Sequence, residues 1–125
     1  MIIGTIKEKK KFENRVAISP DEVKNYVKAG HQVLIEKNAG LLSGFTDKNY
    51  KEAGASIASA KEILSSSDIV VKINCPSSDE AKQLKSSSMV ISQLNTQNEV
   101  DTIKIFNSKK ISAFSLERVP RITRA

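Results

Sequence analysis

The chain has 125 residues, and its 39% hydrophobic and 27% charged composition predicts one folded domain rather than a disordered segment. No apolar run approaches the ~20 residues that cross a bilayer, and the single cysteine excludes an internal disulfide and fits a reducing compartment. The net charge of +6 suggests nucleic-acid binding, but the lysines are scattered and no aromatic residue stands among them as a stacking platform. We therefore expect a cytoplasmic domain that neither binds nucleic acid nor enters a membrane.

The first elements alternate between strand and helix. Residues 2–6 form an apolar run bounded by charge, which predicts a buried strand, and residues 7–18 lack periodicity, which predicts a loop. Ser19 can cap a helix, Pro20 fits its first position, and Glu22 stands three residues after the cap. The helix that begins here is the clearest in the sequence.

Glycines separate the next elements. Gly30 ends the first helix, and the continuous apolar run within residues 32–36 predicts a second strand. After a glycine-containing loop, Thr46 is expected to cap a short helix that ends at Gly54. Residues 55–58 then suggest a brief strand at the edge of the sheet.

The second half repeats this alternation, with strands expected at residues 68–73, 89–94 and 111–116 and helices opening at Ser59, Ser77 and Thr96. Ser59 and Glu62 have the spacing of a capping box. The Ile-Val-Val run within residues 68–73 predicts a strand buried on both faces. The expected fold is therefore α/β, a doubly wound, mostly parallel sheet with helices on both faces.

Arginines gather after the last predicted strand. Arg118, Arg121 and Arg124 follow it, and the planar fork of arginine suits phosphate. In open parallel sheets ligands bind at this carboxyl edge. The segment is interpreted as a phosphate-facing loop, with one of the three arginines expected to be a solvated surface residue.

Three more residues are expected at the same edge. Arg15 lies in the loop after the first strand, and Lys72 and Asn74 end the fourth, so these side chains are placed to converge. An equally open alternative for Arg15 is that it ties its loop down by pairing with Glu13 or with a helix carboxylate.

Other site chemistry is not indicated. The glycines do not form the G-x-G-x-x-G fingerprint of dinucleotide-binding turns. His31 is interpreted as a residue of a helix-to-strand turn, without a cysteine or carboxylate at ligand spacing, so no metal site is predicted. Cys75 has no local basic cluster to activate its thiol, which favours an inert cysteine.

Five short motifs occur in order: Ile3-Gly4, Glu13-Asn14-Arg15-Val16-Ala17, Ser19-Pro20, Val27-Lys28-Ala29-Gly30-His31 and Gly40-Leu41-Leu42-Ser43-Gly44-Phe45. Together they resemble the first lobe shared by alanine dehydrogenases and the alpha subunit of proton-translocating NAD(P) transhydrogenase. The resemblance covers nearly the whole chain and implies a flavodoxin-like lobe, similar to the formate/glycerate dehydrogenase catalytic domain. It also implies that residues 1–125 are a single lobe, truncated before a Rossmann NAD-binding domain.

Two stretches distinguish the members of this family. Alanine dehydrogenases carry a Lys-Val-Lys-Glu-Pro motif whose second lysine holds the substrate, whereas this chain has Lys72-Ile73-Asn74-Cys75-Pro76. Residues 92–96 also lack the catalytic histidine that should follow. By contrast, Val119-Pro120-Arg121-Ile122-Thr123-Arg124-Ala125 closely resembles the transhydrogenase segment Val-Pro-Arg-Ile-Ser-Arg-Ala. The resemblance therefore favours the transhydrogenase.

In that enzyme the segment begins a loop that binds NAD(H), which implies cofactor contacts from Arg121, Ile122, Thr123 and Arg124, with Arg121 beside the nicotinamide. The implied reaction is hydride transfer between NAD(H) here and NADP(H) on a partner domain, coupled to proton translocation, with no catalytic side chain in this chain. The implied partners are the NADP-binding and membrane components. Homodimerisation at full length and a location peripheral to the inner membrane are also implied.

Two alternatives remain open. The chain alone is expected to be inactive, either as part of that larger oxidoreductase or as a non-catalytic remnant lobe that dimerises or binds a partner subunit. An alanine-dehydrogenase-like lobe is less favoured, because of Asn74 and the missing histidine.

Overall fold

The computed structural model describes residues 1–9, 13, 15–93 and 100–115. The described strands are β1 (Ile2–Thr5), β2 (Gln32–Glu36), β3 (Ser56–Ala58), β4 (Ile69–Val71), β5 (Met89–Ser92) and β6 (Ser112–Ser115). The described helices are α1 (Pro20–Lys28), the 3-10 turn η1 (Leu41–Ser43), α2 (Asp47–Ala53), α3 (Ala60–Ser66), α4 (Ser78–Gln83) and α5 (Val100–Lys109). The predicted alternation of strands and helices is confirmed.

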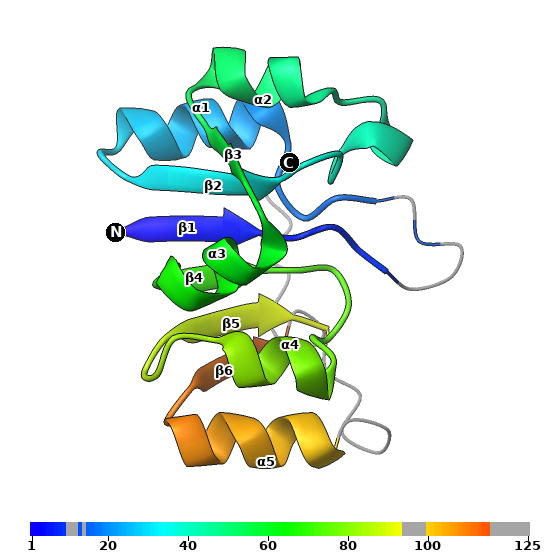
Figure 1. Cartoon of the computed structure of the whole chain (residues 1–125). Coiled ribbons are helices and arrows are strands. Elements are labelled where there is room, and N and C mark those ends of the chain that lie inside the picture. Colours follow the sequence, from blue (N-terminus) through cyan, green and yellow to red (C-terminus); the bar gives the residue numbers. More distant parts are fainter. Residues whose placement is uncertain (10–12, 14, 94–99, 116–125) are drawn as a thin grey trace, which may run out of the picture.

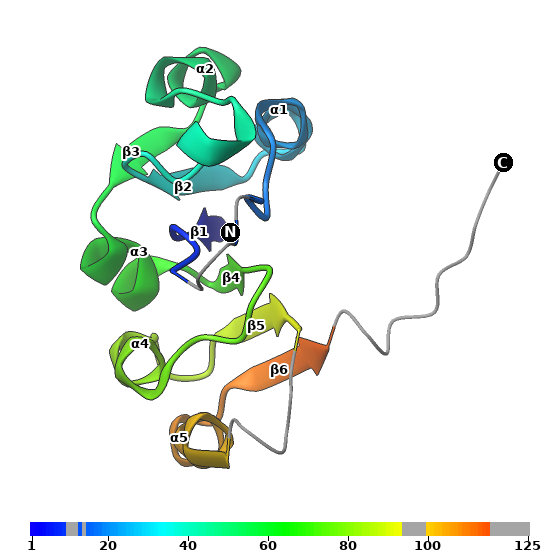
Figure 2. The ribbon, with the colours of Figure 1, turned by 90° about the vertical axis from the view of Figure 1, so that its right-hand side faces the viewer.

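The described strands form one sheet in the order β3-β2-β1-β4-β5-β6, and every neighbouring pair is parallel. Five neighbouring strands, in the order β2-β1-β4-β5-β6, follow the flavodoxin-like arrangement. Strand β3 extends the sheet at its edge beyond β2. Helices α1 and α2 lie on one face, and α3, α4 and α5 lie on the other (Figures 1 and 2). The predicted doubly wound α/β fold is confirmed.

Two apolar clusters, one on each face, hold these layers together. One includes Val23 of α1, Tyr50 of α2 and Val33 of β2, and the other includes Leu34 of β2, Leu64 of α3 and Val90 of β5. The alternation of Val33 and Leu34 shows how β2 serves both faces, since successive strand residues point in opposite directions. Both faces of the sheet are therefore packed around β1 and β2.

Most of the predicted helix starts are confirmed by hydrogen bonds. Ser19 and Ser77 each form a full capping box with the glutamate three residues later, and Thr46 forms one with Asn49. At Ser59 the prediction is half wrong, because its hydroxyl accepts the Glu62 N–H but the reciprocal bond is not formed. The predicted start at residues 96–99 lies outside the described residues.

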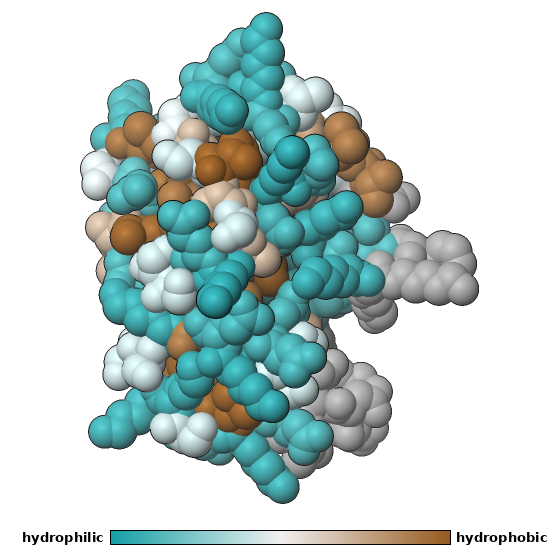
Figure 3. All heavy atoms as spheres, viewed as in Figure 1, coloured by the Kyte–Doolittle hydropathy of each residue, from teal (hydrophilic) through white to brown (hydrophobic). Residues whose placement is uncertain are grey.

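The surface in Figure 3 is mostly hydrophilic, with apolar residues in separate patches. Within the part of the chain that the structure describes, no helix combines the length and the apolarity that a membrane span requires.

Candidate functional site

The topology singles out the carboxyl ends of β1 and β4. The chain passes outward from β1 to β2 and β3, then returns to place β4 on the other side of β1. This reversal is the switch point at which open α/β sheets bind ligands. The segments that follow β1 and β4 leave the sheet at the same edge, on the right of Figure 1. The residues on these two segments therefore form the candidate site.

Glu8 is the buried centre of this edge. Its carboxylate accepts the backbone N–H groups of Ile73 at 3.0 Å and Asn74 at 3.1 Å, and the Asn74 side-chain amide at 3.4 Å. These bonds join the segment after β1 to the segment after β4. Sequence reasoning missed Glu8, whose one signal is that it is the single acidic residue among the lysines of residues 7–11.

Lys72 is buried against this carboxylate. Its Nζ lies 3.3 Å from Glu8 Oε1 and 3.9 Å from Glu80 Oε1, and Glu80 Oε1 also accepts the Ser77 N–H at 2.9 Å as part of the α4 cap. The exposed Lys9 approaches Glu80 Oε2 at 3.8 Å. Lys72 therefore lies at the predicted edge and is joined to Asn74 through Glu8, but two buried carboxylates hold its ammonium group inside the fold.

Asn74 and Arg15 do converge, through Glu13. The Asn74 amide donates to Glu13 Oε1 at 3.0 Å, and Arg15 donates to both Glu13 oxygens at 2.9 Å, from Nε and from Nη2. Glu13 is 9% exposed as a side chain and Arg15 is 64% exposed. The alternative in which Arg15 pairs with Glu13 is confirmed.

The Arg15 fork lowers the pKa of Glu13 to about 2, with the Asn74 amide assisting, and burial opposes the shift. Because the folded-state pKa lies below the ordinary 4.5, the stabilisation is complete above about pH 4.5 and is lost as the pH falls towards 2. Arg15→Gln should return the pKa of Glu13 towards its ordinary value, measured by NMR titration of the carboxyl carbon. A pKa that stays at about 2 in this variant would contradict the pairing.

The remaining sequence candidates stand apart. His31 follows α1 and donates its backbone N–H to Tyr26, as expected for a turn residue, and Cys75 is half-buried. Arg118 and the implied cofactor contacts, Arg121, Ile122, Thr123 and Arg124, lie outside the described residues. Among the residues that are described, no three His, Cys, Asp or Glu side chains form a group that could hold a metal ion.

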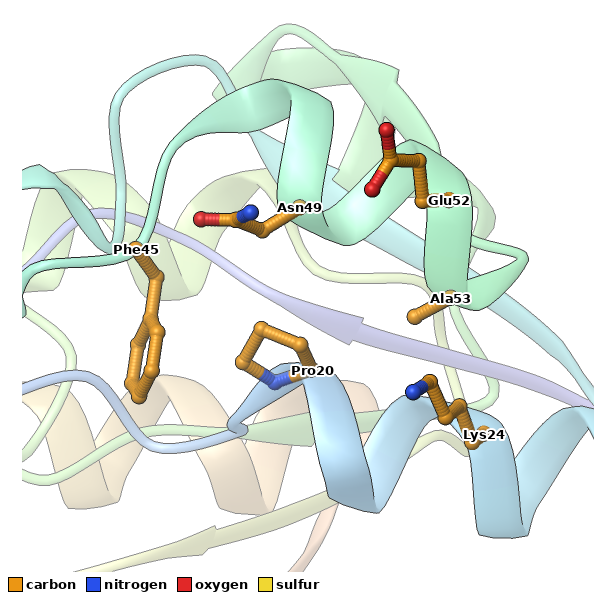
Figure 4. Close-up of a pocket in the computed structure, with 6 residues that line it drawn as sticks. All are labelled: Pro20, Lys24, Phe45, Asn49, Glu52 and Ala53. Atoms are coloured by element: carbon orange, nitrogen blue, oxygen red, sulfur yellow. The ribbon is translucent and has the colours of Figure 1, made fainter.

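A separate shallow groove of about 390 Å³ lies between α1 and α2 (Figure 4). Its lining residues are Pro20, Lys24, Phe45, Asn49, Glu52 and Ala53. None of them belongs to the charged cluster at the switch point. Lys24 and Glu52 lie on opposite walls of the groove, and they are the charged residues among those that line it. Its lining therefore does not gather several groups of one charge that could bind a charged ligand, and the switch point remains the candidate site.

An all-parallel lobe with a polar cluster at its switch point belongs to the class of α/β domains that bind ligands at that edge. The sequence profile described as alanine dehydrogenase/PNT, N-terminal domain, matches residues 4–125. The chain therefore belongs to this family, which comprises NAD-dependent oxidoreductases.

Relatives from both branches of the family are similar to the chain. It is 36% identical to NAD(P) transhydrogenase subunit alpha of Haemophilus influenzae, over 100% of this chain and 24% of that protein. It is 41% identical to alanine dehydrogenase of Methanococcus maripaludis, over 95% of this chain and 32% of that protein. The chain thus spans between a quarter and a third of these relatives, which contain further domains.

Solved structures show the same division. The structure of transhydrogenase from Sinorhizobium meliloti matches with a TM-score of 0.91 at 31% identity, over 99% of this chain and 37% of that chain. An L-alanine dehydrogenase matches with a TM-score of 0.89 at 32% identity, over 98% of this chain and 35% of that chain. Fold and overall identity therefore do not separate the two activities.

Proposed function

We propose that this chain is the first lobe of the NAD(H)-binding component of a proton-translocating NAD(P) transhydrogenase. In this proposal residues 1–125 precede a Rossmann domain, and NADP(H) is held by a partner domain that associates with a membrane component. The lobe alone is inactive, because it holds only part of the nucleotide site.

The charge pairing at the switch point carries the proposal. An amino- or keto-acid substrate needs cations that are free to bind its carboxylate. Here Asn74 stands where alanine dehydrogenases have the substrate lysine, and its amide donates to Glu13 and Glu8. Arg15 is engaged by Glu13 through its fork, and Lys72 is enclosed by carboxylates.

The balance of charge supports the same choice. In the cluster of ion pairs at this edge, the carboxylates of Glu8, Glu13 and Glu80 are paired with the buried ammonium of Lys72 and the exposed groups of Arg15 and Lys9. Each of these cations already has a carboxylate partner. A substrate carboxylate would meet an Arg15 whose Nε and Nη2 are already bonded to Glu13, and taking this fork would cost the two hydrogen bonds of that pair.

The chemistry of hydride transfer belongs to the nicotinamide cofactor. The described edge contains no glycine-rich phosphate cradle, so the proposal assigns cofactor contact to Arg121, Ile122, Thr123 and Arg124. Their task would be to hold the nicotinamide. The task of Glu8 and the residues bonded to it would be to fix the carboxyl edge of the sheet, where the segment that contains Arg121 leaves it. No described side chain is assigned an acid, base or nucleophile role.

One pair of assays on the protein that contains this chain distinguishes the two activities. We expect NADPH-dependent reduction of an NAD analogue, and no NADH oxidation driven by pyruvate and ammonium. Pyruvate-dependent turnover would establish the second candidate, alanine dehydrogenase, which the 41% identity to the Methanococcus maripaludis enzyme favours. Absence of both activities together with absence of NADH binding would favour a non-catalytic lobe.

Replacement of Arg121 tests the cofactor contact. Arg121→Ala in that protein should weaken NADH binding about tenfold or more, since a charge-assisted bond to the cofactor is lost. Arg121→Lys should recover only part of the affinity, because lysine lacks the planar fork. Lys104→Ala, an exposed charge on α5, is the matched control. Calorimetric titration measures all three, and equal affinities for the Arg121 and Lys104 variants would contradict the assignment.

A further inference from the structure

Tyr50 is a fully buried residue of α2 whose hydroxyl reaches the loop after β1. Its phenol donates a hydrogen bond of 2.8 Å to the backbone carbonyl of Ile18, 32 residues earlier in the chain. This carbonyl stands just before the α1 cap at Ser19, and among the described residues Tyr50 is the donor that it has. A buried carbonyl without a donor is costly. The hydroxyl of Tyr50 therefore matters here as well as its ring.

The loop after β2 fixes the place of this phenol. Gly40 passes so close that an added Cβ would stand 2.6 Å from Oη and 2.7 Å from Cε2 of Tyr50. Phe45 packs edge-on against the ring, with the two ring centroids 6.2 Å apart. Burial, assisted by the charges of Glu22 and Asp47, raises the pKa of Tyr50 to about 12, so the phenol remains a donor at neutral pH. Tyr50 thus joins the loop after β1 to the loop after β2.

The loop that Tyr50 holds carries the exposed side of the candidate site. Arg15 lies three residues before Ile18, and the two residues between them pack against the same apolar cluster as Tyr50. At its start the loop is anchored by Glu8, which accepts hydrogen bonds from the segment after β4. The Tyr50 bond anchors its other end. The part of the loop that pairs Arg15 with Glu13 therefore lies between two buried anchors.

We infer that Tyr50 is a positioning residue of the candidate site, which holds Arg15 against Glu13 through the Ile18 carbonyl. A loop that is fixed at both ends has fewer conformations than one fixed at a single end, so the anchor lowers the entropy cost of forming the Arg15 fork. In the proposed function this closed pair leaves no free fork for a substrate carboxylate. Tyr50 would thereby contribute to substrate selectivity, a consequence that rests on the proposed function.

Tyr50→Phe tests this role, because it removes the hydroxyl and keeps the ring. The measured quantity is the pKa of the Glu13 carboxyl in the protein that contains this chain, followed by carbon-13 NMR and assigned by the loss of its signal in Glu13→Gln. We expect this pKa to rise from about 2 by about one pH unit or more, because a loosened Arg15 holds the ionised carboxylate less firmly. Tyr26→Phe is the matched control, since this half-buried tyrosine packs against the same cluster and should leave the pKa unchanged.

Two further variants separate positioning from a general loss of stability. In the Arg15→Gln background, Tyr50→Phe should change the pKa of Glu13 no further, because the hydroxyl acts through Arg15. Gly40→Ala should reproduce the rise while the hydroxyl is retained, since its methyl group would displace the phenol oxygen. The φ of −97° at Gly40 is open to alanine, so the added methyl group is the only change. If Tyr50→Phe fails to fold, Gly40→Ala carries the same test.

A Glu13 pKa that stays at about 2 in Tyr50→Phe, together with a lowered free energy of unfolding, would make Tyr50 a merely structural residue and overturn the inference. An equal rise in Tyr26→Phe, or a further rise in the Arg15→Gln background, would overturn it as well. None of these measurements depends on activity. Pyruvate-dependent turnover would therefore contradict the proposed function and leave the positioning role of Tyr50 intact.

Discussion

Lys72→Met should destabilise the domain by about 3–5 kcal/mol, because removing one partner of a buried ion pair leaves the other charge uncompensated. Here two carboxylates lose their cation. Glu8 Oε1 lies 3.3 Å from Lys72 Nζ and Glu80 Oε1 lies 3.9 Å from it. Methionine has a similar length and no charge, so the change removes the ammonium group with little change in volume. The free energy of unfolding is measured by urea denaturation.

Lys9→Met is the matched control, because Lys9 also approaches Glu80 but is 66% exposed. We expect it to cost at most about 1 kcal/mol, as solvated ion pairs do. The double variant Glu8→Gln/Lys72→Met should be less destabilised than the sum of its single variants, since it removes opposite charges together. Equal costs for Lys72→Met and Lys9→Met would contradict the buried-pair account.

The sequence predicted those features of the fold whose signals are local. The caps at Ser19, Thr46 and Ser77 consist of residues three apart, and each is found where it was expected. The carboxyl edge as the candidate site followed from the alternation of strands and helices alone. The convergence of Arg15 and Asn74 followed from the same rule, because parallel strands end at one edge.

The buried ion cluster could not be predicted in this way. Glu8 contacts residues 64 to 66 positions away, and nothing in its own segment indicates that it is buried. Lysine runs are normally solvated, as Lys7 and Lys9 are here, so the composition of this segment favoured the wrong environment for Glu8. Lys72 was placed at the correct edge, but its partner decides whether the ammonium group faces a ligand or the interior. Burial of a charge depends on which distant charge meets it.

The burial of β4 is a second limit of sequence reasoning. The prediction that this strand is buried on both faces is wrong, because Val70 is buried but Ile69 and Val71 on the opposite face are only half-buried. The Ile-Val-Val run has the same pattern whether a strand is covered by its own domain or by a segment elsewhere in a longer polypeptide. The hydrophobicity of a strand indicates that its faces are to be buried, but it does not identify the segment that buries them. The half-buried Ile69 and Val71 became interpretable only when the strand order was known.

Gly4→Ala should destabilise the domain by about 3 kcal/mol, the upper range for overpacking a core. Gly4 lies in β1, between β2 and β4, where α3 crosses the sheet. An added Cβ would stand 2.5 Å from Ile63 Cγ2 and closer still to Ser67 Oγ. Both side chains are buried, and the backbone N–H of Ser67 donates to the Ile63 carbonyl as the cap of α3, so the backbone that carries them cannot move aside cheaply.

Gly44→Ala provides a contrasting control, because its Cβ would meet no atom within 4 Å but its φ of +86° is left-handed. Its cost should be only the backbone penalty of about 1 kcal/mol. Adding Ser67→Gly to Gly4→Ala should recover part of the lost stability, since it removes the nearest obstacle. Urea unfolding compares the three variants. If Gly4→Ala costs no more than Gly44→Ala, the β1–α3 contact is looser than the structure shows. If the cost is as expected, Gly4 sets the distance between α3 and the sheet beside the switch point.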